Sequence, residues 1–208
     1  MSAEQLRELQ EKIREDTQAL PLHATKMVPG EGPYNSQIMF VGEALGATEQ
    51  EKGRPFVGDA GKLLNEILEK SGINREEIYI TNVVKARPSD NGTKNRAPNV
   101  TEIAAHEMWL WKEIELIKPK IIVTLGRIAS RVLLKNNKLI MGKVVGQTFT
   151  EGFSDIIIIP CWHPSYLMTY GPSKINDEIQ YFRKAKRLQH LRKLWKPETV
   201  SSKEWHVS

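Results

Sequence analysis

Cysteine is almost absent from this 208-residue chain, in which Cys161 is the only one. A single cysteine excludes an intramolecular disulfide and an iron–sulfur cluster held by four thiolates of the same chain. No apolar run approaches the roughly 20 residues that a membrane-spanning helix needs. Residues 1–5 are polar and lack the apolar centre of a secretory signal. We therefore expect a cytoplasmic protein with no membrane partner, no metal and no other cofactor.

A strong excess of one charge is also missing. The chain has 30 Lys and Arg against 25 Asp and Glu, a formal net charge of +5 and a pI of about 9.2. This modest excess permits nucleic-acid binding without requiring it. Basic residues gather near the C-terminus, where a solvated helix face and a phosphate-tracking surface are both open interpretations. These residues are Arg183, Lys184, Lys186, Arg187, Arg192, Lys193 and Lys196.

Four short apolar runs, at 38–41, 78–83, 121–125 and 156–160, have the composition of buried parallel strands. Helical patterns separate them, and another helical pattern follows the last run. Alternating strands and helices predict an α/β fold, namely a three-layer α/β/α sandwich around a central four-stranded, mainly parallel sheet. We expect a single domain over residues 1–197 and a flexible tail over 198–208.

Polar residues follow three of these strands. Glu43 comes after the first, Asn82 closes the second and His163 follows the fourth. Carboxyl ends of parallel strands meet at one edge of a sheet, where ligands bind in α/β proteins. Phe56 lies on a Gly/Pro-stiffened loop just after the first strand. A carboxylate, an amide, an imidazole and an aromatic ring at one edge indicate chemistry on a flat heterocycle.

These side chains suit the excision of a nucleobase. The Asn82 amide can pair with the N3–H and O4 edge of uracil, whereas cytosine presents the opposite pattern. His163 can donate to O2 as negative charge develops on the leaving base. Glu43 can position water and stabilise positive charge on the sugar, and Phe56 can stack on the base. The target nucleotide must leave the duplex to reach such a pocket.

The chain resembles the uracil-DNA glycosylase superfamily, in particular its family 4, which is usually built around an iron–sulfur cluster. The resemblance rests on segments that occur in the family's order: 28–32, 41–44, 53–58, 82–85, 95–98, 125–127 and 163–165. It implies a water-activating role for Glu43, stacking by Phe56 and base recognition by Asn82. It also implies contact between His163 and the leaving base, and it places Gly42 and Glu49 in the base-binding set, with Glu49 near the pyrimidine 5-position.

Two departures from the family pattern stand out. The cluster cysteines of the family map to Thr17, Leu20, Ala86 and His106, none of which is cysteine here. Ordinary packing must therefore replace the cluster, with His106 as a packed or hydrogen-bonded residue. Leu45 stands where the family's first motif has proline, and leucine restores a backbone N–H that proline lacks.

Phosphate contacts would hold most of the DNA. The candidates are Lys85, Arg87, Lys94 and Arg96, which flank the second strand and the polar loop after it. Ser165 offers a backbone contact, and Tyr166 with the two residues after it offers either an apolar wedge or simple loop anchoring. The expected partner is DNA containing uracil or a modified pyrimidine, bound by a monomer.

The leading hypothesis is thus a monofunctional DNA glycosylase that removes uracil and leaves an abasic site. One alternative is a glycosylase for another modified pyrimidine, such as a 5-substituted uracil or cytosine, in repair or in defence against foreign DNA. An alternative of another class is a non-catalytic DNA-binding or partner-binding protein of the same fold. A nucleotide-phosphate enzyme fits less well, because residues 58–63 lack the glycine spacing and the Ser/Thr of a phosphate loop.

Overall fold

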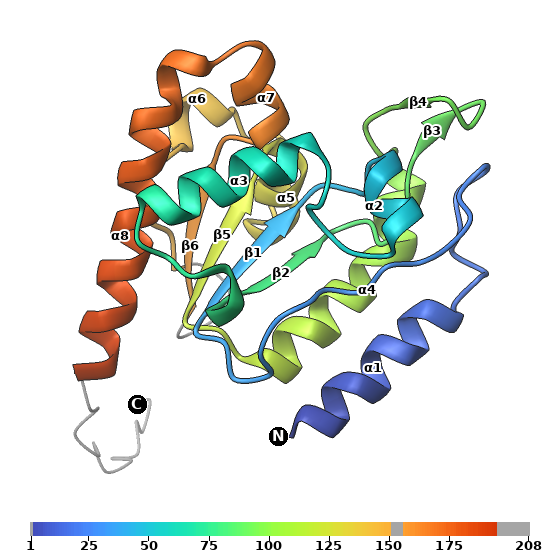
Figure 1. The fold of residues 1–208 in the computed structure, drawn as a ribbon, viewed down its shortest axis with the longest axis horizontal. Coiled ribbons are helices and arrows are strands. Elements are labelled where there is room, and N and C mark those ends of the chain that lie inside the picture. Colours follow the sequence, from blue (N-terminus) through green and yellow to red (C-terminus); the bar gives the residue numbers. More distant parts are fainter. Residues whose placement is uncertain (1, 151–155, 195–208) are drawn as a thin grey trace, which may run out of the picture.

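The structure, a computed structural model, describes residues 2–150 and 156–194, so the expected tail at 198–208 lies outside the described residues (Figure 1). Its main sheet consists of β1 (Ile38–Gly42), β2 (Tyr79–Asn82), β5 (Ile121–Leu125) and β6 (Ile157–Cys161). A hairpin is formed by β3 (Ser89–Asp90) and β4 (Lys94–Asn95). The helices are α1 (Ala3–Glu15), α2 (Ala47–Lys52), α3 (Asp59–Lys70), η1 (Arg75–Glu77), α4 (Val100–Ile117), α5 (Arg127–Leu133), α6 (Met141–Val144), α7 (Pro164–Thr169), η2 (Pro172–Lys174) and α8 (Ile175–Leu194).

The main sheet has the strand order β2-β1-β5-β6, and every pairing in it is parallel. β1 therefore lies between β2 and β5. After β1 the chain first adds β2 on one side of it, and later adds β5 and β6 on the other side. This reversal creates a crevice beyond the carboxyl ends of the strands. The four expected strands and the three-layer α/β/α sandwich are confirmed.

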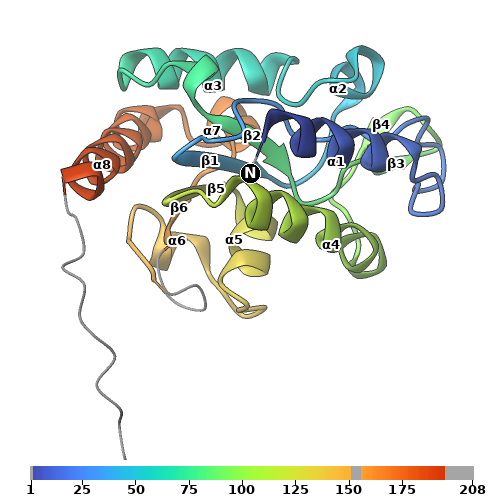
Figure 2. The same ribbon diagram turned by 90° about the horizontal axis from the view of Figure 1, so that it is seen from below.

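Both faces of the sheet are covered by helices (Figure 2). Along β1 the side chains alternate between the two cores: Ile38 and Phe40 belong to the apolar cluster of α3 and α8. Met39 and Val41 belong to the cluster that α1, α4 and α5 complete. A strand buried on both faces needs apolar side chains at every position, which is why these strands are continuous apolar runs.

Local sequence signals explain where several elements begin. Asn99 is the N-cap of α4, and Asn99 and Glu102 form a reciprocal capping box with two N–H···O contacts of 2.9 Å. The polar stretch after β2, predicted as an exposed loop, contains the β3–β4 hairpin. The short helices α2, α6 and α7 were not predicted, because they have only four to six residues and no full amphipathic repeat.

Packing and hydrogen bonds occupy the region that the resemblance assigned to a metal cluster. Ala86 lies in a small apolar core against which Leu20 packs. The buried His106 accepts a hydrogen bond at Nδ1 from the Lys85 N–H (3.1 Å), and its Nε2 lies 2.8 Å from the Ala19 carbonyl oxygen. These residues offer no thiolate, so they do not fit an iron–sulfur cluster. Among the described residues, no group of three or more His, Cys, Asp or Glu side chains is placed to hold a metal ion.

We expect His106→Leu to lower the free energy of unfolding by about 2–4 kcal/mol, because it leaves the buried Lys85 N–H and the partly buried Ala19 carbonyl oxygen without this partner. Burial lowers the pKa of His106 from 6.5. The unfolded chain thus takes up this proton first, and wild-type stability decreases as pH falls below about 6.5; the variant lacks that contribution. Urea unfolding between pH 5 and 8 measures both effects. Met108→Leu, at an exposed position of the same helix, is the control, and a loss below about 0.5 kcal/mol for His106→Leu would contradict the assignment.

Candidate active site

A cleft of about 710 Å³ opens at the carboxyl edge of the sheet. Glu43, Asn82 and His163 all line it, as does Phe56, so the sequence-based expectation that they meet at one edge is confirmed. Its other walls come from the segment before α2, from β4 and the residues after it, and from α7. The volume lies within the range of about 300–1,000 Å³ that is typical of small-molecule sites.

Glu43 is held by the first turn of α5. Its Oε1 accepts a hydrogen bond from the Ile128 N–H at 2.9 Å. Gly126 makes this approach possible, because a Cβ at that position would collide with the Glu43 carboxylate and crowd the His163 Cβ, and because its φ of +100° is unfavourable for other residues. Burial raises the pKa of Glu43, while the amides and charge of residues 127 and 128 oppose that rise.

The amide of Asn82 faces the cleft with an unused acceptor. Asn82 is 3% exposed, and within the described part of the chain its Oδ1 has no hydrogen-bond partner. A Cβ at Gly42 would collide with this oxygen and with the Phe56 ring, so glycine is required there. A buried acceptor without a partner is costly unless a ligand supplies the donor. The pocket is therefore built for a group with an N–H or O–H at this point.

The tautomer of His163 follows from its hydrogen bonds. Nδ1 accepts a hydrogen bond from the Ser165 backbone N–H at 3.2 Å and lies 2.7 Å from the Ser165 hydroxyl oxygen. Burial lowers the pKa of His163 to about 4, although the charge of Glu49 opposes this shift. The ring is therefore neutral at pH 7 and carries its proton on Nε2. It can donate one hydrogen bond to a ligand while adding no positive charge.

Glu49 fixes the loop that carries Phe56. Its Oε1 accepts from the N–H groups of Val57 (2.9 Å) and Gly58 (2.7 Å). Phe56 itself has a φ of +52°, an uncommon conformation for a bulky residue, and its ring lies 6.0 Å from the His163 ring between centroids. Two charge-assisted hydrogen bonds thus hold a strained loop in the shape that presents the ring to the cleft.

Lys85 was expected to contact DNA phosphate, and the structure contradicts this. Its side chain is fully buried and its Nζ bonds to Glu113 (2.5 Å), to the Thr81 hydroxyl (2.6 Å) and to the Asn82 carbonyl oxygen (2.7 Å). Burial lowers the pKa of Lys85, and Glu113 opposes that shift. A lysine in this setting cannot reach a phosphate; it instead fixes the backbone of Asn82 from behind the cleft.

Arg87 was also expected at the DNA surface, but it is only 7% exposed and its guanidinium shapes the β3–β4 hairpin. It donates to Asn95 Oδ1 (2.7 Å) and to the carbonyls of Gly92 and Thr93. Direct phosphate contact by Arg87 is therefore a wrong expectation as well.

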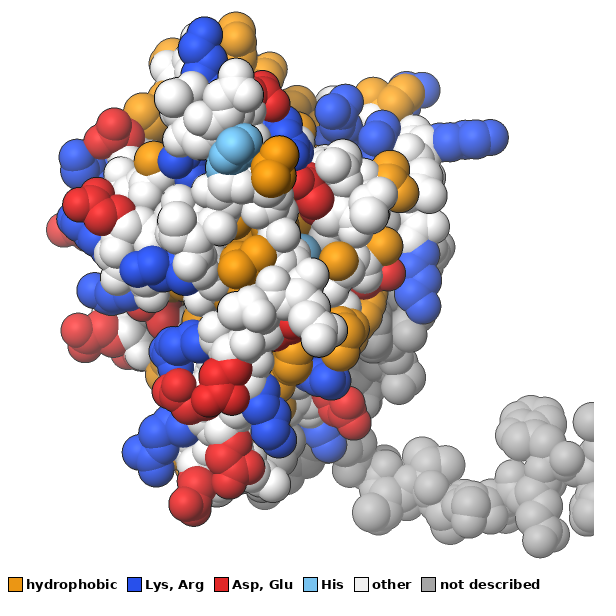
Figure 3. Space-filling view, turned by 90° about the vertical axis from the view of Figure 1, so that its right-hand side faces the viewer, with side chains coloured by type: hydrophobic (Ala, Val, Ile, Leu, Met, Phe, Trp, Pro, Cys, Tyr) orange, Lys and Arg blue, Asp and Glu red, His pale blue; other side chains and the backbone are white. Residues whose placement is uncertain are grey.

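Arg96 lines the cleft and pairs with Glu102 and Asp90, while Lys94 is exposed on β4. Basic and acidic side chains are interspersed on the side of the molecule that carries α2 and this hairpin (Figure 3). Phosphate contacts on that side must come from individual residues rather than from an extended basic surface. For Lys94 and Arg96, DNA binding remains a prediction.

Two features of the cleft were not anticipated. Asn95 lines it beside Arg96, although the sequence signalled it only as part of the segment 95–98. The N–H of Leu45 donates to the Ala86 carbonyl oxygen at 3.3 Å, a bond that the family's proline could not make. Leu45 is 3% exposed, so the loop after β1 is anchored to the segment that holds Lys85 and Arg87.

Comparisons with known proteins agree with this arrangement. Residues 29–196 match the family described as the uracil DNA glycosylase superfamily. A type-4 uracil-DNA glycosylase from Thermotoga maritima is 44% identical over 160 residues, which cover 76% of this chain and 80% of that protein. A type-4 uracil-DNA glycosylase from Sulfurisphaera tokodaii is 40% identical over 170 residues, covering 79% of this chain and 75% of the relative.

A solved structure shows the same fold at low sequence identity. The crystal structure of SMUG2 from Pedobacter heparinus superposes with a TM-score of 0.54 at 16% identity, covering 75% of this chain and 77% of that one. Fold and cleft define an α/β protein whose ligand site lies at the carboxyl edge of a parallel sheet. The chain belongs to the uracil-DNA glycosylase superfamily and resembles its type 4 in sequence.

We expect Lys85→Met to lower the free energy of unfolding by about 3–5 kcal/mol, because it leaves the Glu113 carboxylate buried without its cation. Adding Glu113→Gln should restore part of that loss, since the unpaired charge is removed. Urea unfolding of both variants measures this. If the second change destabilises the first variant further, the buried pair is not the reason for the loss.

The same variant tests the corrected role of Lys85. Its DNA affinity should keep the wild-type dependence on salt, because no phosphate contact is lost. Lys94→Met, at an exposed position, should reduce the slope of log affinity against log salt by about one. Fluorescence anisotropy with a labelled oligonucleotide measures both slopes; a reduced slope for Lys85→Met would restore the original expectation.

Proposed function

We propose that this protein is a monofunctional DNA glycosylase that hydrolyses the N-glycosidic bond of uracil in DNA and leaves an abasic site. The observation that carries the proposal is the buried Oδ1 of Asn82, an acceptor that lacks a partner among the described residues and faces a cleft with Glu43, His163 and Phe56. Uracil supplies the missing donor with its N3–H. The type-4 relatives, which bear the name uracil-DNA glycosylase, support the choice of base.

In the proposed complex the flipped base stacks on Phe56, and its Watson–Crick edge pairs with the Asn82 amide. Oδ1 accepts from N3–H and Nδ2 donates to O4. Cytosine has no hydrogen at N3 and carries an amino group at C4, so it would face the Asn82 amide acceptor to acceptor and donor to donor. Such a mismatch at a buried polar group supports discrimination of about 10⁴-fold.

The reaction breaks the bond between the base nitrogen and C1′ of the sugar. As it breaks, negative charge moves onto the base, where the neutral His163 donates its Nε2 proton in a hydrogen bond to O2. Positive charge develops on the sugar near the Glu43 carboxylate, which also orients water and accepts its proton as the new C1′–O bond forms. The products are the free base, after it is protonated, and an abasic site.

Glu49 has two roles in this proposal. Its Oε1 holds the Phe56 loop, and its carboxylate lies near the 5-position of the base, where it disfavours the methyl group of thymine. Gly42 leaves room for the base plane beside Asn82. Ser165 positions His163, and Tyr166, which lines the cleft, contacts DNA in the proposed complex. Of the proposed wedge residues, Leu167 is fully buried, so only Tyr166 and Met168 remain available.

We also propose the remaining assignments that the sequence suggested. The protein acts as a monomer in the cytoplasm on DNA that contains uracil, and residues 1–197 make up its single domain. Among the described residues, no helix is both long enough and apolar enough to cross a membrane. A modified pyrimidine remains the alternative substrate, because Leu45 alters the loop beside the base. A non-catalytic role is less compatible with a cleft that retains all four key side chains.

A single-turnover excision panel tests the proposal with uracil, cytosine, thymine, 5-hydroxymethyluracil and a 5-modified cytosine in otherwise matched oligonucleotides. Uracil should be removed at least about 10⁴-fold faster than cytosine. Asn82→Ala should abolish most of that preference, and Glu43→Gln should slow excision by about 10²–10⁴-fold. Glu66→Gln, an exposed acid-to-amide change on α3, is the control. Cleavage of a 5-substituted base without cleavage of uracil would favour the alternative enzyme, and no cleavage of any base would favour the binding protein.

The excision rate should depend on pH through Glu43. Because burial raises its pKa above 4.5, the carboxylate is protonated, and the base function lost, as pH falls through a midpoint above that value. His163, with a pKa of about 4, is almost entirely neutral above pH 5.5 and adds no second step there. Single-turnover rates between pH 5.5 and 8 should therefore show one acidic limb. A limb that persists in the residual activity of Glu43→Gln would assign it to another group.

A further inference from the structure

Three aromatic rings form a ladder beside the cleft. Trp162 lies two residues before α7, Tyr166 lies in that helix and Tyr170 is its C-cap, so the three rings follow one another at intervals of four residues. The centroids of Trp162 and Tyr166 are 4.7 Å apart with planes at 21°, and those of Tyr166 and Tyr170 are 5.8 Å apart with planes at 38°. Side chains packed in this way hold one another in place.

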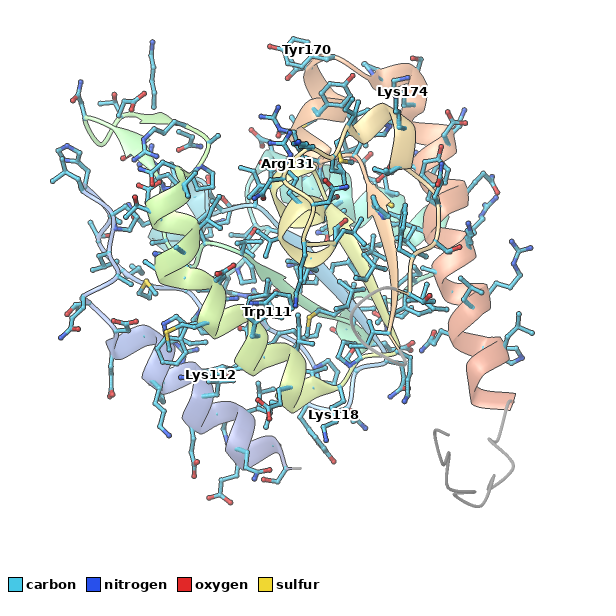
Figure 4. All side chains as sticks on the ribbon, turned by 180° about the vertical axis from the view of Figure 1, so that it is seen from behind. Trp111, Lys112, Lys118, Arg131, Tyr170 and Lys174 are labelled. Atoms are coloured by element: carbon cyan, nitrogen blue, oxygen red, sulfur yellow. The ribbon has the colours of Figure 1, made fainter. Side chains whose placement is uncertain are left out.

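The outer ring of the ladder is presented to solvent. Tyr170 is 76% exposed, and Figure 4 shows it at the outer end of α7, with Lys174 nearby. Its backbone is fixed all the same, since its N–H donates to the Tyr166 carbonyl oxygen at 2.8 Å and the N–H of Gly171 donates to the same oxygen at 3.1 Å. An apolar ring in water on a fixed backbone has no evident structural task, because it covers little of the core.

The ladder is continuous with the cleft. Tyr166 and Tyr170 both line it, together with the half-exposed Met168 between them. Phe56 and Asn82, which are buried, also line it, and its volume of about 710 Å³ lies in the upper half of the range for small-molecule pockets. The cleft thus has room for more of the DNA strand than the flipped base alone.

We propose that this ladder is a second nucleobase site, in which the Tyr170 ring stacks on a base adjacent to the flipped nucleotide in the same strand. The inference rests on the proposed function. Aromatic stacking suits an unpaired neighbour, because every base has a flat face and this contact needs no particular sequence. Lys174, whose Nζ lies 5.9 Å from the centroid of Trp162, places a positive charge at the same end of the molecule for the strand's phosphates.

Four proteins, each measured on three DNA substrates, test this site. The proteins are wild type, Tyr170→Ala and Tyr170→Phe, with Tyr34→Ala as a control at a 38% exposed tyrosine before β1, at the opposite edge of the sheet. The substrates are single-stranded oligonucleotides with one uracil, in which the 5′ neighbour, the 3′ neighbour or neither is replaced by an abasic spacer. Single-turnover excision is measured as a function of protein concentration.

We expect Tyr170→Ala to raise the half-saturating protein concentration about tenfold on the intact strand, which corresponds to one stacked base, with little change in the maximal rate. On the strand whose spacer removes the stacked base, wild type and Tyr170→Ala should bind alike. Tyr170→Phe and Tyr34→Ala should behave as wild type, because the former keeps the ring and the latter is remote from the cleft.

Other results overturn the inference. An unchanged half-saturating concentration for Tyr170→Ala on the intact strand would do so. An increase of the same size on the intact strand and on both spacer strands would also do so, since the ring would then not act through a neighbouring base. If the wild type removes no uracil, the proposed function fails separately, and anisotropy with the same oligonucleotides still decides whether Tyr170 contacts a neighbouring base.

Discussion

The buried carboxylate of Glu113 organises the part of the molecule that positions Asn82, the residue proposed to recognise the base. It accepts hydrogen bonds from the Gly30 N–H, from the Tyr79 and Thr81 hydroxyls and from the Lys85 ammonium. These bonds join the loop before β1 to β2 and to α4. Lys85 passes this constraint to the Asn82 carbonyl oxygen. A buried ion pair contributes little net stability in itself, but removing one partner leaves a charge that water cannot reach. The arrangement therefore admits few alternative positions for the Asn82 amide.

The other groups of the cleft are positioned in the same manner, by hydrogen bonds to backbone N–H groups. The α5 amide of Ile128 holds Glu43, those of Val57 and Gly58 hold Glu49, and that of Ser165 orients His163. Each interaction uses one side of a functional group and leaves another side facing the cleft. Such preorganisation means that little rearrangement is required when charge develops during a reaction.

Hydrogen bonds and packing fill the region where the family resemblance implied a metal cluster. His106 bonds to two backbone groups that belong to different segments, and Leu20 and Ala86 add apolar contacts. The Leu45 N–H contributes a further link, to the Ala86 carbonyl oxygen. Both departures from the family's sequence pattern thus concern the same segment, residues 85–87, which leads from the base-reading strand to the β3–β4 hairpin. Hydrogen bonds and packing hold this segment in place.

The sequence by itself determined the strands, their parallel arrangement and the meeting of Glu43, Asn82 and His163, because buried parallel strands are continuous apolar runs and their carboxyl ends share one edge. It could not determine the surroundings of each charge. Lys85 and Arg87 looked like surface cations beside the site, and only the tertiary structure shows one paired with Glu113 and the other inside a hairpin. Asn95 and Tyr170 line the same cleft as Glu43, which lies far from both in the sequence. The periodicity of a sequence indicates on which side of its own strand or helix a side chain lies. Burial and ion pairing depend instead on other elements, which pack against that strand or helix from distant parts of the chain.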